Sequence, residues 1–341
     1  MIDNILNLSV EKNSHQISFM LGHKVLFKTD FDWNEIGDAT LKIDEWEDLK
    51  DLALKPNEKI QLETKGYVGG LYQTKNDLIW KFSFIEQKDC FRAFFSIINS
   101  KLKTDCQIQN PLFWDLLKKE TGLFIFAGPR RSGKSSLIAE VCDKMKNEKI
   151  NLTGIHLTEN EMTWSNFENM VHLGTDATDW DINHPVYDGL ERIIVDCNSV
   201  RKLEKWIEMC EQGRSVFITV TAETVQIALQ QILEKLSPGY IQRFFNKLNG
   251  IVVQKLSGPS RAPIHEMFLN NNSEVEQIRN EIQRFKAEGL IELKSFSNKS
   301  YQSLNQSISQ NLIRRQIDVK SAFASSNDPE ELDQLLKKMG L

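Results

Sequence analysis

The residues best suited to chemistry form one short loop. Residues 128–135 read Gly-Pro-Arg-Arg-Ser-Gly-Lys-Ser, which fits the phosphate-binding P-loop pattern; an apolar run, Leu123–Ala127, precedes them and a helical pattern follows. In such a loop the backbone N–H groups face a polyphosphate, the lysine adds a positive charge and the final serine ligates Mg²⁺. The alternative is a chance match. We expect ATP and Mg²⁺ as cofactors, with nucleotide bound by Gly128, Ser132, Gly133, Lys134, Ser135 and Ser136.

A P-loop also needs an acidic residue at the end of a neighbouring strand to hold the metal. Asp196 closes the apolar run Arg192–Val195 and is the candidate, so Ser135 and Asp196 form the predicted metal site. The alternative is that Asp196 caps the following helix, whose apolar residues include Leu203 and Ile207. Both roles are compatible.

The composition is that of an ordinary soluble protein. Of 341 residues, 40% are hydrophobic and 26% are charged, which excludes a disordered or fibrous chain. No apolar run approaches the ~20 residues of a membrane span. The net charge of −5 predicts no nucleic-acid partner, and five scattered cysteines indicate neither a disulfide framework nor a zinc site.

The strand and helix patterns predict an α/β protein. In the first 100 residues, apolar runs at 17–21, 25–27 and 79–85 indicate strands, 46–54 indicates a helix, and Gly69-Gly70 marks a turn before the next strand. The polar stretch 99–110 is the predicted linker. Beyond it, apolar strands alternate with helices, which favours a parallel sheet buried on both faces. The polar, helix-periodic end includes a helix at 329 that Asp328 caps and Glu331 completes as a capping box.

The chain resembles the type IV pilus retraction ATPases, the PilT-like branch of the secretion ATPase superfamily. The resemblance rests on the order and spacing of several segments over almost the whole length. They are the loop at 128–136, Ile-Ile-Val-Asp at 193–196, Cys-Glu-Gln-Gly-Arg-Ser-Val-Phe at 210–217, Ala-Pro-Ile-His-Glu-Met at 262–267 and the tail segments 300–308 and 328–332.

The resemblance implies a fold and a machine. By analogy, residues 1–105 form a PAS-like N-terminal domain, 106–270 a RecA-like nucleotide-binding core and 271–341 a helical C-terminal region. The family implies a hexameric ring that binds ATP between the two domains and drives pilus retraction and twitching motility. The expected partners are other copies of the chain, a conventional retraction ATPase in a mixed ring, and an inner-membrane pilus platform protein. We expect a cytoplasmic protein, peripheral at the inner membrane.

The sequence departs from the family at the chemistry. Asp196 stands in place of the Walker B glutamate and remains an anionic oxygen ligand. The family's Ile-Glu-Asp-Pro box, which supplies the water-activating glutamate, should lie near residues 152–161; there Glu159 and Glu161 are the candidate catalytic bases. The family's sensor histidine falls on Thr221, and 184–191 replaces an arginine-rich stretch. Lys81 and Arg92 fall near the family's phosphate-facing arginines or are solvated strand cations.

Three hypotheses follow. The first is an ATP-binding ring subunit that hydrolyses slowly or not at all and acts as an accessory or regulatory subunit. The second is an active retraction ATPase in which Glu159 or Glu161 is the base. The third is a structural interaction protein with a vestigial P-loop.

Overall fold

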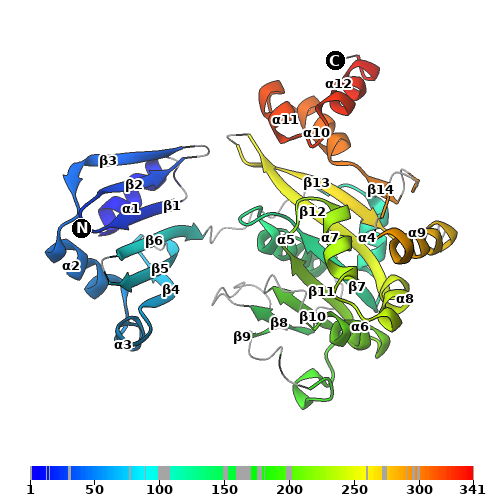
Figure 1. Cartoon of the computed structure of the whole chain (residues 1–341), viewed down its shortest axis with the longest axis horizontal. Helices are drawn as coiled ribbons and strands as arrows, with labels where there is room; N and C mark the ends of the chain where they lie inside the picture. Colours follow the sequence, from blue (N-terminus) through cyan, green and yellow to red (C-terminus); the bar gives the residue numbers. More distant parts are fainter. Residues whose placement is uncertain are drawn as a thin grey trace. The chain divides into compact units, whose positions relative to one another are not determined.

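The chain folds into two compact units, each with its own sheet and its own core. The computed structural model describes residues 2–12, 14, 16–29, 32–76, 78–88, 90–98, 108–148, 153–158, 170–174, 179, 181–196, 202–258, 260–270, 275–289, 291–293, 296–297 and 300–340. The units comprise residues 1–102 and 103–341 (Figure 1). Among the described helices, none is long and apolar enough to cross a membrane.

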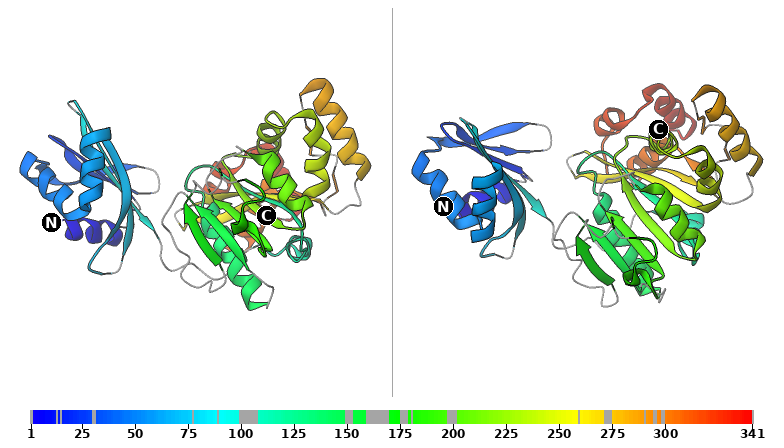
Figure 2. Two further views of the ribbon diagram at one scale, coloured as in Figure 1. Left: turned by 90° about the horizontal axis from the view of Figure 1, so that it is seen from below. Right: turned by 60° about the horizontal axis from the view of Figure 1, so that its bottom comes forward.

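The first unit is an antiparallel sheet covered by helices on one face. Its strands lie in the order β3-β2-β1-β6-β5-β4, and every neighbouring pair is antiparallel. The helices α1, α2 and α3 pack on the face that carries the aromatic core (Figure 2), as a PAS-like domain requires. The elements are α1 (Ile2–Glu11), β1 (Gln16–Met20), β2 (Lys24–Lys28), β3 (Trp33–Thr40), α2 (Ile43–Ala53), α3 (Pro56–Lys65), β4 (Tyr67–Gln73), β5 (Ile79–Gln87) and β6 (Cys90–Ile98).

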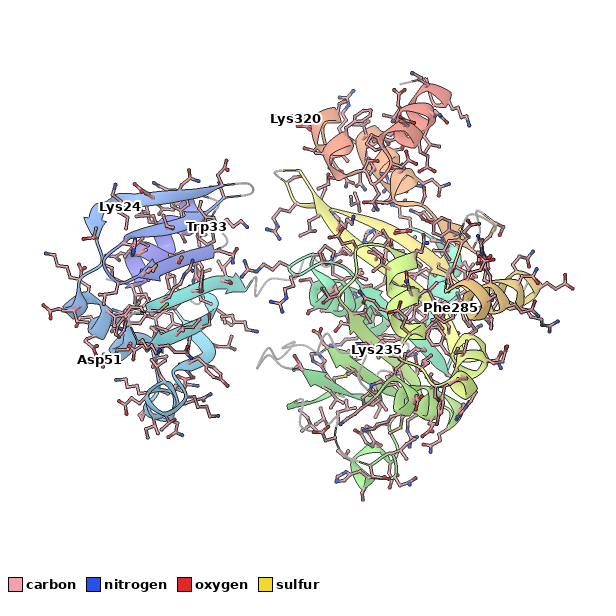
Figure 3. The ribbon with its side chains drawn as sticks, viewed as in Figure 1. Lys24, Trp33, Asp51, Lys235, Phe285 and Lys320 are labelled. Atoms are coloured by element: carbon pink, nitrogen blue, oxygen red, sulfur yellow. The ribbon has the colours of Figure 1, made fainter. Side chains whose placement is uncertain are left out.

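The alternating pattern of β5 explains which face is covered. Trp80, Phe82 and Phe84 are buried, whereas Lys81 between them is exposed. Successive side chains of a strand point to opposite faces, so one face of β5 is apolar and the other polar. The edge strand β3 is more exposed to solvent than β5. Lys24 of the neighbouring strand β2 is labelled in Figure 3, and its ammonium group lies 2.7 Å from the carboxylate of Glu35 on β3. Such charges on an edge oppose pairing with another strand.

The turn predicted at Gly69-Gly70 is wrong. Both glycines lie inside β4, in register with β5. A Cβ atom on Gly70 would lie 2.6 Å from Phe82 Cζ and 2.6 Å from Glu58 Oε1. The glycine is therefore required by close packing within the sheet and under α3 rather than by a change of chain direction.

The second unit is a mainly parallel sheet of eight strands in the order β14-β13-β12-β7-β11-β10-β8-β9. The pairs from β12 through β9 are parallel, and β13 and β14 add antiparallel pairs at one edge. This confirms the RecA-like prediction of a parallel core. The strands are β7 (Gly122–Ala127), β8 (Gly154–Thr158), β9 (Met170–Gly174), β10 (Arg192–Asp196), β11 (Ser215–Val220), β12 (Leu248–Ser257), β13 (Ala262–Leu269) and β14 (Tyr301–Gln302).

Helices cover both faces of this sheet. On one face, α6, α7, α8 and α9 share a core with the sheet; on the other, Phe113 of α4 contacts Phe124 of β7 at a ring-centroid distance of 5.7 Å, and α5 packs on β7 (Figures 1 and 2). Every residue of β7, β10 and β11 is buried. The helices are α4 (Pro111–Leu117), α5 (Lys134–Asn147), α6 (Leu203–Glu211), α7 (Val225–Leu233), α8 (Pro238–Lys247) and α9 (Val275–Glu288).

The last helices pack against the antiparallel edge. Helices α10 (Leu304–Ile313), α11 (Val319–Ser325) and α12 (Pro329–Lys338) enclose a small core with Ile264 of β13. Asp328 caps α12 by accepting from Glu331 N–H at 3.0 Å, as predicted. A capping box would also pair the Glu331 carboxylate with Asp328 N–H, and this bond is not the one observed. Asp328 N–H donates to Ser326 Oγ instead, and the Glu331 carboxylate accepts from Asn305. A tertiary contact replaces half of the capping box.

Substitution of Phe95 tests the aromatic core of the first unit. The Phe95 ring lies 5.6 Å from Phe19 and 5.9 Å from Phe84, centroid to centroid, and is fully buried. We expect Phe95→Ala to lower the free energy of unfolding by about 3–5 kcal/mol, measured by denaturant unfolding. Phe94→Ala, on the opposite face of the same strand, serves as the matched control and should cost less. Equal losses for the two variants would contradict this assignment of the core.

Candidate functional site

The phosphate loop connects β7 to α5 and has the backbone conformation that its glycines allow. Gly128 has φ +154° and Gly133, the N-cap residue of α5, has φ +83°, a left-handed conformation that favours glycine. A Cβ atom on Gly128 would lie 2.3 Å from Ser132 Oγ. The loop thus closes tightly on itself, with Ser132 N–H donating to the Pro129 carbonyl at 3.3 Å. Lys134 then begins α5, and the N-terminal amides of a helix favour an anion.

Lys134 is buried at the start of α5. Its ammonium group donates to the carbonyl oxygens of Gly128 at 2.9 Å and Pro129 at 2.8 Å. Burial lowers the pKa of Lys134, Arg130 lowers it further, and Asp196 opposes that shift. A buried ammonium held mainly by neutral carbonyl groups is a strong site for an anion, since a phosphate group would compensate its charge.

Ser132 supplies a second sign that the loop fits phosphate. Its Oγ atom is buried, and within the described residues it has no hydrogen-bond partner. A buried hydroxyl without a partner carries a desolvation cost that a phosphate oxygen would remove. Ser135 and Ser136 follow in the first turn of α5, where Ser135 is half-buried and Ser136 exposed. The loop residues therefore fit a nucleotide phosphate chain.

The metal-binding candidate lies at the same edge of the sheet. Asp196 ends β10, and β11 lies between β10 and β7, which leads into the loop. Asp196 is buried, and its Oδ2 atom lies 4.0 Å from His156 Nε2. The alternative role as a helix cap is wrong, because Lys202 is the N-cap residue of α6. Asp196 is thus an acidic residue at the strand end expected for a metal ligand.

Gln254 contacts the loop from β12, and the sequence analysis missed it. Its Nε2 atom donates to the Ser132 carbonyl at 2.7 Å, and its Oε1 atom lies 2.9 Å from His265 Nε2. Because the amide nitrogen faces Ser132, the amide oxygen must accept, so His265 carries its proton on Nε2. In the sequence, Gln254 is a polar residue directly after the apolar run Ile251–Val253, and only the structure shows that its side chain is buried.

The His265-Glu266 pair of the predicted family segment holds two different parts of the unit. His265 N–H donates to Ser307 Oγ of α10 at 2.9 Å. The Glu266 carboxylate accepts from Val225 N–H at the start of α7 at 3.1 Å and from the Tyr301 hydroxyl at 2.7 Å. Burial raises the pKa of Glu266. The pair thus ties strand β13 to helices on both of its faces.

Of the positions that depart from the family, Thr221 lies at the same edge of the sheet as the loop, and segment 184–191 lies at the opposite edge. Thr221 directly follows β11, which lies between β7, the strand before Gly128, and β10, which ends in Asp196. Segment 184–191 directly precedes Arg192, the first residue of β10. In the segment 184–191, Tyr187 is buried in the core and its hydroxyl accepts from Lys205 at 3.0 Å. Burial lowers the pKa of Lys205 to about 8. This segment is anchored to the core, and its own sequence carries no arginine.

Three guanidinium groups gather beside the loop. Arg261 donates to the Arg131 carbonyl at 3.2 Å, and burial together with the charges of Arg261 and Arg130 lowers the pKa of Arg131. Arg131 has φ +66°. Mutual repulsion among these cations favours an anion nearby. Arg130 and Arg131 therefore add positive charge at the loop.

The other predicted residues belong to the first unit or lie outside the described residues. Lys81 on β5 and Arg92 on β6 belong to the first unit and share the sheet face opposite the aromatic core. Arg92 Nε donates to Ser18 Oγ at 3.4 Å, and its guanidinium lies 4.2 Å from the Phe94 ring centroid. Glu159 and Glu161, the predicted bases, lie outside the described residues.

A pocket of about 790 Å³ lies elsewhere in the second unit, between α4, β13 and α10. His265 forms part of its wall, together with Asn311 and Arg314. Its lining residues include no acidic side chain, and no P-loop residue. We therefore place the candidate site at the loop and not in this pocket.

Comparisons with known structures identify the fold. The ATPase DotB of Legionella pneumophila superposes with a TM-score of 0.76 over 95% of this chain and 94% of its own, at 13% identity. The pilus retraction motor PilT with bound ADP superposes with a TM-score of 0.70 over 98% of this chain and 99% of its own, at 19% identity. The ATPase DotB of Yersinia pseudotuberculosis superposes with a TM-score of 0.70 over 95% of this chain and 92% of its own, at 13% identity. No protein-family model and no curated protein matches the chain. The chain thus has the two-domain fold of these ATPases.

The buried histidine predicts a pH dependence of stability. Burial lowers the pKa of His265 to about 4 from 6.5, so the unfolded chain binds a proton that the folded chain rejects between those values. Stability should fall as the pH drops through this window, by about 3 kcal/mol in total. Denaturant unfolding of the protein and of His265→Gln across the window measures the difference. His23→Gln, at an exposed histidine, should leave the profile unchanged; identical profiles for all three proteins would contradict the expectation.

Proposed function

We propose that the chain is an ATP-binding, ring-forming subunit of a type IV pilus retraction motor, slow in hydrolysis, that acts as an accessory or regulatory subunit. The main support for this proposal is the phosphate loop, in which Lys134 is buried among neutral carbonyl groups. Asp196 lies at the end of β10, a nearby strand. The loop holds the phosphates, and Ser135 and Asp196 hold Mg²⁺. Mg²⁺ held there would supply positive charge to the phosphate oxygens.

Binding and hydrolysis make different demands on the site. Binding needs the loop amides, the ammonium group and a metal ligand, all of which this chain supplies. Hydrolysis also needs a positioned base and cations that stabilise developing charge, each worth orders of magnitude in rate. Thr221 is uncharged, and segment 184–191 has no arginine. These differences support tight binding with slow turnover.

The fold supports a role in a ring. DotB and PilT share the two-domain architecture over nearly their whole lengths. In such a motor the nucleotide state sets the angle between domains, so binding energy becomes rigid-body motion. We propose that this chain forms a hexameric ring, alone or mixed with a conventional retraction ATPase, at the cytoplasmic side of the inner membrane. Its partner there is the pilus platform protein, and twitching motility is the process served.

Removing the lysine charge tests nucleotide binding. We expect Lys134→Ala to weaken binding of a fluorescent ATP analogue by at least about 100-fold, because the substitution removes the buried positive charge of the loop. Lys146→Ala, an exposed lysine later in α5, should bind like the unaltered protein. Saturable, Mg²⁺-dependent binding supports the proposal. Its absence from the unaltered protein would favour a vestigial loop instead.

Phosphate release tests the slow hydrolysis. We expect the assembled protein to turn over ATP at least about 100-fold more slowly than a conventional retraction motor assayed in parallel. Turnover at the motor's rate that Lys134→Ala abolishes would contradict this expectation.

The second candidate, an active retraction ATPase, has one observation in its favour: β8 ends at Thr158, in register with Asp196, directly before Glu159. In that case Glu159→Gln with Glu161→Gln should abolish turnover and spare binding.

A further inference from the structure

We propose that Gln254 is a positioning residue for the phosphate loop, held in orientation by His265. The inference rests on the proposed nucleotide binding and assigns the residue that holds the loop in its binding shape. Gln254 belongs to strand β12. The preceding residue, Val253, pairs with Ala127 of β7, so the sheet and not the loop fixes the position of Gln254.

The first step is the direction of one peptide group. Gln254 Nε2 donates to the Ser132 carbonyl oxygen at 2.7 Å. In a planar trans peptide, the C=O of one residue and the N–H of the next point in opposite directions. Holding the Ser132 carbonyl toward β12 therefore turns the Gly133 N–H away from β12. That N–H is the donor that a phosphate at the start of α5 requires.

The second step is that Gln254 has only one useful orientation. A reversed amide would place its oxygen against the Ser132 carbonyl oxygen, where two acceptors repel. His265 reinforces the observed orientation, because its Nε2 atom lies 2.9 Å from Gln254 Oε1 and the tautomer that carries the proton on Nε2 donates to that oxygen. His265 is held in turn by the pairing of Gln254 with His265 across β12 and β13 and by Ser307. Both side chains are 5% exposed, so water does not compete for these bonds.

The third step is the close fit between Gln254 and the loop. A Cβ atom on Gly133 would lie 2.6 Å from Gln254 Nε2, and one on Gly128 would lie 2.4 Å from the Gln254 carbonyl oxygen. The two glycines that shape the loop therefore also admit β12 against it. Gln254 therefore supports one side of the loop, which makes it a specific target for substitution.

The test compares two buried amides of the same unit. Gln254→Met keeps the side-chain volume and removes the donor to Ser132. Asn270→Leu is the matched control, because Asn270 Nδ2 donates to the carbonyls of Phe245 and Leu248 at 2.9 Å each, away from the loop. We expect both variants to lower the melting temperature. Only Gln254→Met should raise the Kd for Mg-ADP, by about tenfold. A wild-type Kd for Gln254→Met would overturn the proposal.

A double variant tests the role of His265. His265→Ala should raise the same Kd by less than Gln254→Met, since the amide then loses its orienting partner but keeps its donor. Adding His265→Ala to Gln254→Met should have no further effect on the Kd, because both act through one contact. Additive effects on binding would overturn the assignment of His265.

Hydrogen exchange separates this inference from the proposed function. In nucleotide-free protein, Gln254→Met should speed amide exchange in residues 130–134 relative to the unaltered protein, and Asn270→Leu should not. If the unaltered protein binds no nucleotide, the proposed function fails, and this measurement still decides whether Gln254 holds the loop. Unchanged exchange in Gln254→Met would overturn the positioning role.

Discussion

The second unit depends on one constraint, which is that parallel strands deliver their carboxyl ends to the same edge of a sheet. Strands β7, β11 and β10 lie side by side, and all their residues are buried. Polar groups required for chemistry must therefore follow the strands rather than interrupt them. The phosphate loop, Thr221 and Asp196 meet at this edge although up to about 90 residues separate them in the sequence.

The same constraint explains why the core of the fold was predictable. Burial on both faces demands continuous apolar runs, and such runs are visible without knowledge of their neighbours. The apolar run Arg192–Val195, closed by Asp196, forms strand β10 with Asp196 as its last residue. The phosphate loop was predictable for a related reason. Its glycines, lysine and serine all lie within eight consecutive residues, so the sequence pattern contains every residue type that the loop requires.

Features that depend on distant contacts were not predictable. A glycine pair fits both a turn and a crowded strand, and only the contacts of Gly70 with Phe82 and Glu58 decide between them. Gln254 looks like an ordinary polar residue of a strand until Ser132, 122 positions earlier, lies against its amide. The local capping pattern at Asp328 and Glu331 was half right, because Asn305 takes the Glu331 carboxylate. In each case a partner from another element determines the role.

This difference between local and distant contacts also bears on how such a site diverges. The charge that attracts phosphate comes from Lys134, whose pKa burial depresses and Asp196 supports, and both residues are present. The charges that act on the transferring phosphate must come from other elements, and each can be exchanged without disturbing the loop. In segment 184–191, buried Tyr187 is held by Lys205 and the core, through contacts that the loop does not share. The loop and this segment are therefore held by different contacts, so a substitution in one need not disturb the other.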